Sequence, residues 1–332
     1  MSGIAELREV ICEKLWNDNG VSYKPNEISV GTGAKQSLMN AVLALCGPGD
    51  EVLIPTPCWV SYIEMVKLAD ATPILVPCRE ETGFALDLEA IEKAISEKTK
   101  AIMINTPNNP TGAVYEKEDL IKLGELAVKY DFCIIADEIY EKLVYDGRAH
   151  YSIASYSEEM RQRTVIINGF SKAYAMTGWR LGYAAGPSYI IKGINSIQGH
   201  MTSNTCSIAQ YAGIEALKGP QQELQDMILA FDERRKYTVQ RLQAMDGISC
   251  QIPNGAFYAM PNISGFLGKK YGEWKIRDSF DMAAYLLAEA RIAVVPGAAF
   301  EAPENLRISY SNSIKNLKDA FDRMEEALAK LK

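Results

Sequence analysis

The residues best suited to covalent chemistry are a lysine and an arginine in one short segment. Lys172 follows the apolar run at residues 165–167, and Arg180 comes eight residues later. A lysine held among apolar groups and other cations loses affinity for its proton, so that its amine becomes a usable nucleophile. The alternative is a solvated loop lysine without a chemical role.

A carboxylate and an amide side chain follow two other apolar runs. Asp137 comes directly after residues 132–136, with Tyr140 three positions further on, and Asn109 lies in a loop of turn-forming residues after 101–104. Loops at the carboxyl ends of parallel strands are where α/β proteins bind ligands. Asp137 could equally be a helix cap, and the asparagine loop could be only a turn.

Small residues after the run at 28–30 could bind an anion at the start of a helix. Gly33 and Ala34 lie in this turn, where free backbone N–H groups and the helix dipole favour negative charge. The dinucleotide fingerprint fails because its sixth position is Gln36, and the spacing excludes a Walker A loop. A tight turn without a ligand is the alternative.

An aromatic side chain completes the set. Trp59 lies in a loop after the run at 51–54 and could stack on a flat ligand or simply fill hydrophobic space. Together these five segments supply an anion cradle, an aromatic face, an asparagine, an aspartate with a tyrosine, and a lysine with an arginine. That set matches the parts of pyridoxal phosphate (PLP).

The elements between these segments must bring them together. Apolar runs alternate with helical patterns such as the i, i+3, i+4, i+7 spacing of Leu38, Ala41, Val42 and Leu45. This alternation predicts an α/β fold with a mostly parallel sheet and helices on both faces. The expected strands lie at residues 28–30, 51–54, 73–76, 101–104, 132–136, 165–167 and 181–185.

A smaller α+β unit is expected at the C-terminal end. The patterns predict helices at 221–245, 279–290 and 313–331 and strands at 248–252, 255–260, 292–295 and 307–310. We place the boundary inside the first of these helices, which gives a large PLP-binding domain at 1–232 and a small domain at 233–332. Residues 1–14 are expected to form an amphipathic helix whose apolar side needs cover from its own domain or from a partner.

Composition argues against several classes of protein. The 332 residues include 35 Lys and Arg against 42 Asp and Glu, so a nucleic-acid or anionic-membrane binder is not expected. Seven scattered cysteines without a C-x-x-C motif predict neither a disulfide framework nor a zinc knuckle and favour a cytoplasmic protein. With two histidines in the chain, we expect no metal site. No apolar run is long enough for a membrane helix.

Several motifs in combination resemble one enzyme family. Ser171-Lys172, Met176-Thr177-Gly178-Trp179-Arg180, Asn109-Pro110-Thr111-Gly112 and Asp137-Glu138-Ile139-Tyr140 are similar to those of fold-type I PLP-dependent enzymes. Within that group the sequence resembles the class I/II aminotransferases of the aspartate aminotransferase family, over essentially the whole chain. The resemblance implies an enzyme that uses PLP to move the amino group of an L-amino acid to a 2-oxo acid such as 2-oxoglutarate.

The resemblance also implies how the cofactor ring would be held. Lys172 would be linked covalently to PLP and would transfer the substrate proton, and Asp137 would pair with the ring nitrogen. Asn109 and Tyr140 would hydrogen-bond the 3′ oxygen of the ring, and Trp59 would stack on its face. Lys172, Asp137 and Tyr140 are therefore the expected catalytic residues.

The phosphate and the substrate have their own expected partners. The resemblance assigns the phosphate to the backbone or side chains of Gly33, Ala34, Lys35, Ser171 and Arg180. Arg307 would bind the substrate α-carboxylate next to Asn109 and Trp59. Lys35 would reach a second carboxylate on the substrate, which favours aspartate or another dicarboxylic amino acid, although a helix-start lysine exposed to water is the alternative.

One departure from the family keeps other functions open. Family members begin with several tens of residues before the point that matches residues 2–8, and the sequence is expected to lack that segment. A PLP-binding protein with little or no turnover is therefore one alternative. A second alternative is another PLP reaction on the same fold, such as that of a C–S β-lyase. The resemblance further implies a homodimer whose active sites lie at the subunit interface.

Overall fold

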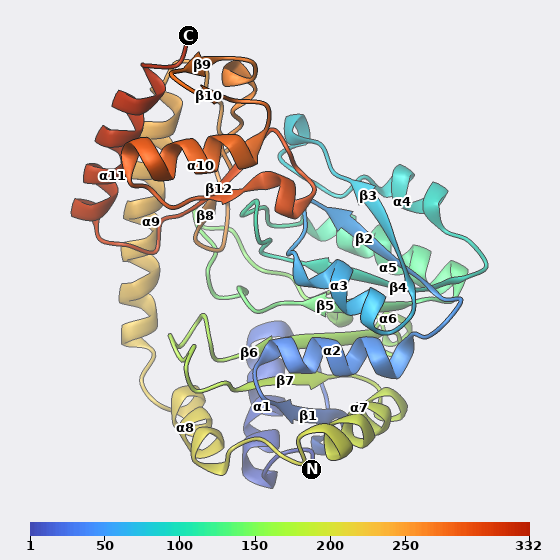
Figure 1. The fold of residues 1–332 in the computed structure, drawn as a ribbon. Helices are drawn as coiled ribbons and strands as arrows, with labels where there is room; N and C mark the ends of the chain where they lie inside the picture. Colours follow the sequence, from blue (N-terminus) through green and yellow to red (C-terminus); the bar gives the residue numbers. More distant parts are fainter.

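A seven-stranded sheet forms the centre of the larger part of the protein. The computed structural model describes residues 1–332. The strands are β1 (Ile28–Gly31), β2 (Glu51–Thr56), β3 (Thr72–Pro77), β4 (Thr99–Asn105), β5 (Cys133–Asp137), β6 (Thr164–Gly169) and β7 (Gly182–Ala185). They lie in the order β1-β7-β6-β5-β4-β2-β3, as Figure 1 shows. Only β7 runs in the opposite direction to the other six strands, so the mostly parallel sheet expected from the sequence is confirmed.

Helices cover both faces of the sheet because both faces of its strands are apolar. Successive strand residues point to opposite sides. In β5, Ile134 packs with the side chains of α4 (Leu88–Ala94) and α5 (Lys117–Tyr130). Its neighbour Ile135 belongs to the core formed with α2 (Ala34–Leu45), α3 (Ser61–Leu68) and α7 (Ser188–Met201). The short α6 (Glu158–Arg161) packs beside α5.

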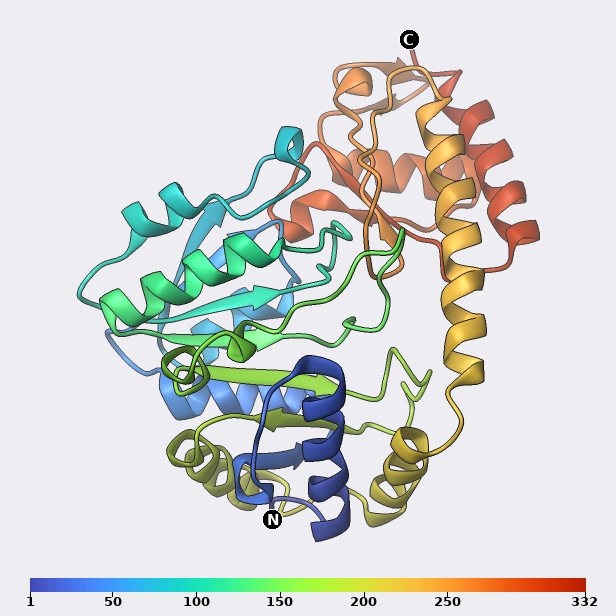
Figure 2. The same cartoon turned by 180° about the vertical axis from the view of Figure 1, so that it is seen from behind.

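The N-terminal helix is covered by its own sheet. It is α1 (Ala5–Asn19), so the helix predicted at residues 1–14 begins four residues later and ends five later than expected. Gly20 ends it in a left-handed conformation with φ 67°. Leu7 and Ile11 are completely buried against β1, β7 and α8 (Ser207–Lys218). Figure 2 shows α1 lying across these strands, so its apolar side needs no partner.

The C-terminal part is a smaller α+β unit. It contains α9 (Gln222–Gln243), α10 (Ser279–Ala290), α11 (Ile314–Leu328) and the short strands β8 (Tyr258–Ala259), β9 (Lys270–Tyr271), β10 (Trp274–Lys275), β11 (Val295–Pro296) and β12 (Leu306–Ser309). Three of these strands pair in the order β11-β12-β8, and β9 and β10 form a separate hairpin. The 3-10 turns of the chain are η1 (Pro25–Glu27), η2 (Glu80–Thr82), η3 (Ile153–Ser155), η4 (Ser264–Phe266) and η5 (Gly297–Phe300).

The predicted strands of this unit were only partly right. Residues 248–252 form no strand, because their pairing stops at a single bridge between Ser249 and Asn262. Pro253 and Pro261 flank the two segments and have no N–H group with which to extend a ladder. The strand predicted at 255–260 is reduced to β8 and the one at 292–295 to β11, which begins at Val295. The β9–β10 hairpin was missed.

The proposed domain boundary lies within α9, which is one continuous helix across residue 232. Its fully buried Arg235 pairs with Asp232 and Asp146 and donates to the Pro253 carbonyl, which ties the helix to the segment after β5. The division into 1–232 and 233–332 therefore stays a prediction. None of the helices combines the length and the apolar composition that a membrane crossing needs.

Candidate active site

One cavity collects most of the residues singled out in the sequence. It has a volume of about 360 Å³ and opens where the carboxyl ends of β4, β5 and β6 meet the C-terminal unit. The expected site residues that line it are Ala34, Lys35, Trp59, Asn109, Asp137, Tyr140, Ser171, Lys172, Arg180 and Arg307. Gly33 lies beside this cavity, in direct contact with the Arg180 guanidinium. The structure thus brings together every residue that we expected in the site.

Asp137 ends β5 and is held by uncharged donors. The Tyr62 hydroxyl donates to its Oδ2 at 2.6 Å, and the Ile139 N–H donates to Oδ1 at 3.1 Å. Burial raises the pKa of Asp137 to about 6, although both hydrogen bonds oppose that shift. Asn105 ends the neighbouring strand and donates to the Asp137 carbonyl at 2.9 Å, which fixes the strand end. The side chain is therefore an orientated carboxylate with no cation in direct contact, although the charge of Lys172 acts on it from a distance.

Lys172 lies in the loop between β6 and β7, among aromatic rings and cations. Its Nζ is 5.5 Å from the ring centre of Tyr140 and 5.2 Å from that of Phe257. Burial, together with the charges of Arg307 and Arg180, lowers its pKa, and the charge of Asp137 opposes this shift only in part. The amine is thus easier to deprotonate than an exposed lysine, as the sequence pattern predicted.

The turn before α2 and Arg180 form a corner whose geometry suits an anion. Gly33 is the N-cap of α2 with φ 81°, and a Cβ there would lie only 2.5 Å from the Arg180 guanidinium. Only glycine permits this close approach. Ala34 and Lys35 follow in the first turn of α2, where backbone N–H groups have no partner within the helix. Arg180 itself has φ 50° and donates to the Thr177 carbonyl at 2.9 Å, which turns its side chain toward this corner.

A second arginine reaches the cavity from the C-terminal unit. Arg307, on β12, donates to Asn109 Oδ1 at 2.9 Å. Its guanidinium lies 4.6 Å from the ring centre of Tyr258 and 4.8 Å from that of Phe300. The Arg307 Nε is buried and has no hydrogen-bond partner. A buried N–H donor without a partner is costly, so this group is suited to receive an acceptor from a ligand.

Lys35 and Trp59 lie together at another edge of the cavity. The Lys35 ammonium is 4.7 Å from the centre of the Trp59 ring, a cation–π distance. Lys35 is exposed and Trp59 is half-buried. Both side chains can therefore reach a molecule in the cavity without losing the packing of α2 and α3.

Four polar cavity residues were not assigned a role from the sequence, in addition to the apolar Leu38 and Ile139. The four polar residues are Tyr62, Asn105, Thr177 and Tyr258. Tyr62 is one helical turn beyond Trp59 and Asn105 follows an apolar run, so both carried a local signal. Tyr258 had none, because it belongs to the other unit and meets Tyr140 through a hydroxyl pair 3.0 Å apart.

Three side chains of metal-ligand type gather outside the cavity. Glu138, Glu141 and His150 each place one ligand atom within 4.8 Å of the others. The Lys14 ammonium pairs with Glu141, and the Asn19 amide donates to both carboxylates. The carboxylates therefore already have a cation and amide donors from α1, so this cluster is best understood as an ionic link between α1 and the segment after β5.

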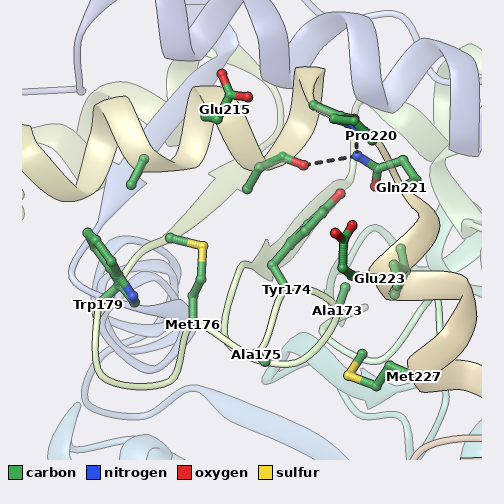
Figure 3. Close-up of a pocket in the computed structure, with 14 residues that line it drawn as sticks. Ala173, Tyr174, Ala175, Met176, Trp179, Glu215, Pro220, Gln221, Glu223 and Met227 are labelled. Carbon is green, nitrogen blue, oxygen red and sulfur yellow. Dashed lines mark hydrogen bonds between the residues drawn. The ribbon is translucent and has the colours of Figure 1, made fainter. Parts of the chain in front are cut away.

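A separate groove lies on the outer side of the Lys172 loop. Figure 3 shows it between the loop at 173–179 and the junction of α8 and α9, with Tyr174, Met176 and Trp179 on one side and Pro220 and Met227 on the other. Its charged residues are the carboxylates Glu215 and Glu223, and no lysine, arginine or histidine lines it. It lacks the cations that an anionic cofactor requires.

Comparisons with known proteins agree with this geometry. The family described as "Aminotransferase class I and II" matches residues 1–324. The aspartate aminotransferase of Bacillus subtilis is 45% identical over 99% of this chain and 82% of its own length. The aspartate/prephenate aminotransferase of Cereibacter sphaeroides is 46% identical over 100% of this chain and 83% of its own.

Solved structures show the same relationship in three dimensions. The crystal structure of the aspartate aminotransferase from Rhizobium meliloti superimposes with a TM-score of 0.97 at 42% identity, covering 100% of this chain and 83% of that one. An aromatic aminotransferase from Pyrococcus horikoshii superimposes with a TM-score of 0.92 at 41% identity, covering 99% and 86%. Sequence motifs, fold and relatives agree, and the chain belongs to the class I and II aminotransferase family.

Proposed function

We propose that this aminotransferase uses PLP to move the amino group of aspartate, or of another dicarboxylic L-amino acid, to a 2-oxo acid such as 2-oxoglutarate. The observation that carries the proposal is the meeting of Lys172, Asp137 and Arg307 in one cavity, although the last comes from the other unit of the fold. The family uses PLP, and several relatives are named for aspartate.

The residues of the cavity fit PLP. The corner formed by Gly33 and Arg180 suits a phosphate, because it combines a helix N-terminus with a guanidinium. Asp137 has only neutral donors around its oxygens, which leaves its charge free to balance a protonated ring nitrogen. Lys172 has a lowered pKa and lines the same cavity, where the charges of both Asp137 and Arg180 act on it.

Each group of residues then has a proposed role in holding the cofactor. Ser171 and Arg180, with the backbone of residues 33–35, would bind the phosphate. Asp137 would pair with the ring nitrogen, Asn109 and Tyr140 would hydrogen-bond the ring oxygen, and Trp59 would cover one face of the ring. When bound, PLP supplies an electron-accepting ring that delocalises the charge left after the substrate Cα loses its proton.

The protein supplies the proton transfer and the orientation of the substrate. The Lys172 amine would accept the Cα proton at Nζ and then deliver it to the cofactor carbon that takes over the amino group, since burial and the nearby arginines lower its pKa and so favour the neutral amine. Arg307 binds the α-carboxylate through a planar guanidinium that Asn109 and two aromatic rings hold in place. Fixing this carboxylate also fixes the direction of the Cα–H bond.

The preference for a dicarboxylic substrate rests on the charges of the cavity. Four cations line it, namely Lys35, Lys172, Arg180 and Arg307. With the phosphate at Arg180 and the α-carboxylate at Arg307, Lys35 remains for a carboxylate at the far end of the substrate. Its position against Trp59 holds the ammonium near the cavity edge.

We also propose a homodimer located in the cytoplasm. Trp179, Met201, Ile208 and Tyr211 are apolar or aromatic and between 49% and 72% exposed. Trp179 and Ile208 line a hollow that also includes Arg180, so this apolar surface adjoins the active site. Exposed apolar surface of this kind favours association. All seven cysteines are free thiols, the state that a reducing compartment maintains.

The direct test is an assay of the purified protein with PLP, L-aspartate and 2-oxoglutarate. We expect oxaloacetate and glutamate in equal amounts. Pyruvate and ammonia released from a cysteine conjugate without any oxo acid would indicate the β-lyase instead. Binding of PLP without any product would indicate a cofactor-binding protein. Light scattering tests the proposed dimer. A result of only monomers at micromolar concentration would contradict it.

A further inference from the structure

Tyr62 is a buried phenol whose hydroxyl points at the carboxylate of the active site. It lies in the first turns of α3, and its side chain is 1% exposed. The hydroxyl donates to Asp137 Oδ2 at 2.6 Å, a short distance typical of a hydrogen bond to a charged acceptor. Trp59 packs edge-on against the Tyr62 ring, with ring centres 5.5 Å apart and planes at 89°.

The surroundings leave this phenol as the strongest side-chain partner of Asp137. The other charged and titratable groups that act on the carboxylate or line the cavity with it are Lys172 from the loop after β6, Glu138 beside it in the chain, and Tyr140. Lys172 contributes through its charge without a hydrogen bond, and Glu138 repels. Burial and the charge of Asp137 raise the pKa of Tyr62 well above 10, so the hydroxyl keeps its proton and remains a donor.

We propose that Tyr62 is a positioning residue that holds the Asp137 carboxylate ionised and aimed at the ring nitrogen of PLP. The inference rests on the proposed function, because it takes Asp137 as the partner of that nitrogen. The two carboxylate oxygens have different anchors, the Ile139 N–H and the Tyr62 hydroxyl, which together fix the plane of the group. Without the hydroxyl, only the backbone donor would remain.

The consequence is a chemical preference for a ring that carries a protonated nitrogen. A buried carboxylate that loses a donor takes up a proton more readily. A protonated Asp137 cannot balance a pyridinium charge. Loss of the Tyr62 hydroxyl should therefore weaken the binding of PLP while leaving unchanged the binding of an analogue that has carbon in place of the ring nitrogen.

The test compares these two ligands on the full-length protein. Dissociation constants for PLP and for its 1-deaza analogue are measured by fluorescence titration at pH 7 for the wild type and for Tyr62→Phe. We expect Tyr62→Phe to raise the dissociation constant of PLP about tenfold, which is the effect of losing one hydrogen bond to a charged group. The dissociation constant of the deaza analogue should change by no more than about twofold. An equal loss for both ligands would show that Tyr62 only packs the cavity wall and would overturn the proposal.

Two matched controls distinguish the loss of the hydrogen-bond donor from a general effect of the substitution on folding. Tyr285 is also completely buried and donates at 2.6 Å, but to the Ala327 carbonyl in the C-terminal unit, so Tyr285→Phe should leave the ratio of the two constants unchanged. If Tyr62→Phe fails to fold, 4-fluorophenylalanine at position 62 fills the space of the hydroxyl without donating. It should show the same selective loss, and 4-aminophenylalanine, which keeps a donor, should restore the preference.

The outcomes also separate this inference from the proposed function. If the wild type binds neither ligand, the proposed function fails. If the wild type prefers PLP over the deaza analogue and Tyr62→Phe keeps the full preference, the proposed function stands and the role of Tyr62 is wrong. In an Asp137→Asn background, Tyr62→Phe should add no further loss of preference, because the group through which it acts is gone.

Discussion

Asp137 and Glu141 are buried carboxylates only four residues apart, yet their surroundings shift their pKa values in opposite directions. Burial raises the pKa of Asp137 to about 6, because its partners are a phenol and a backbone N–H. Burial alone would also raise the pKa of Glu141. The Lys14 and His150 charges, with hydrogen bonds from Lys14 and Asn19, lower it to about 2 instead.

The difference separates a carboxylate that is already paired within the fold from one that remains available to a ligand. Glu141 has a countercharge supplied by the same chain, so its ion pair joins α1 to the segment after β5. Asp137 has donors that orientate it but no cation in direct contact, so its charge is available to a ligand. A perturbed pKa does not by itself mark a functional site, since structural ion pairs such as Lys14–Glu141 perturb pKa values as well.

The largest effect on activity is expected from replacing Lys172. Lys172→Ala should lower the turnover of aspartate with 2-oxoglutarate by about 10²–10⁴-fold, because a positioned acid–base group contributes that much. Lys192→Ala, on the exposed side of α7, is the control and should leave turnover unchanged. A second experiment tests the covalent link to the cofactor directly. Borohydride trapping followed by peptide mapping should place the pyridoxyl group on Lys172. A label on any other lysine would show that the assignment is wrong.

Breaking the ion pair between Lys14 and Glu141 should change the stability of the protein and not its activity. Lys14→Met leaves Glu141 buried without its cation and should lower the free energy of unfolding by about 3 kcal/mol, as for other broken buried pairs. Urea denaturation at pH 7 measures this, and the PLP affinity of the folded variant should change little. Because the folded pKa of Glu141 lies below its ordinary 4.5, its contribution is present above that pH and is lost as the pH falls toward 2. A Glu141→Gln protein should lack this part of the acid sensitivity.

Asp137 should show the opposite pH dependence in the protein without PLP. Its folded pKa lies above the ordinary 3.8, so its contribution to stability is complete below about pH 4 and is lost as the pH rises through about 6. Asp137→Asn removes this titration. Relative to the wild type it should therefore gain about 2 kcal/mol of unfolding free energy between pH 4 and pH 7, while its PLP affinity falls. A variant less stable than the wild type at pH 7 would identify Asp137 as a structural cap.

The smallest effect is expected at the exposed edge of the cavity. Lys35→Ala should raise the KM for aspartate about fivefold, since an exposed ion pair contributes at most about 1 kcal/mol. The KM for alanine, which has no second carboxylate, should stay the same. Steady-state kinetics with both amino acids measures the ratio, and an equal change for both would contradict a role in substrate selection.

Local pattern alone was enough for the sheet and for most site residues on it. The seven strands of the large sheet were predicted because each is a short apolar run, buried on both faces except in the edge strand β3. The residues that follow these runs, such as Asp137, Asn109 and Lys172, must then lie at one edge of the sheet. The two-residue strands of the C-terminal unit were not predictable in the same way. Strands that short have no periodicity to detect, and their pairing depends on segments far away in the chain.

The sequence by itself determined the seven strands of the large sheet in chain order, the strand ends that carry polar groups, and the small turn at Gly33. The resemblance to a family, and not spacing, pointed to Arg307. Only the tertiary structure decided which distant groups meet: Arg307 bonds Asn109 across 198 positions, and Tyr62 bonds Asp137 across 75. The reason is physical. Hydrophobic periodicity indicates which side of a helix or strand is buried. The partner of a buried polar group depends instead on how whole helices and strands pack together, and that packing is set by contacts between residues far apart in the sequence.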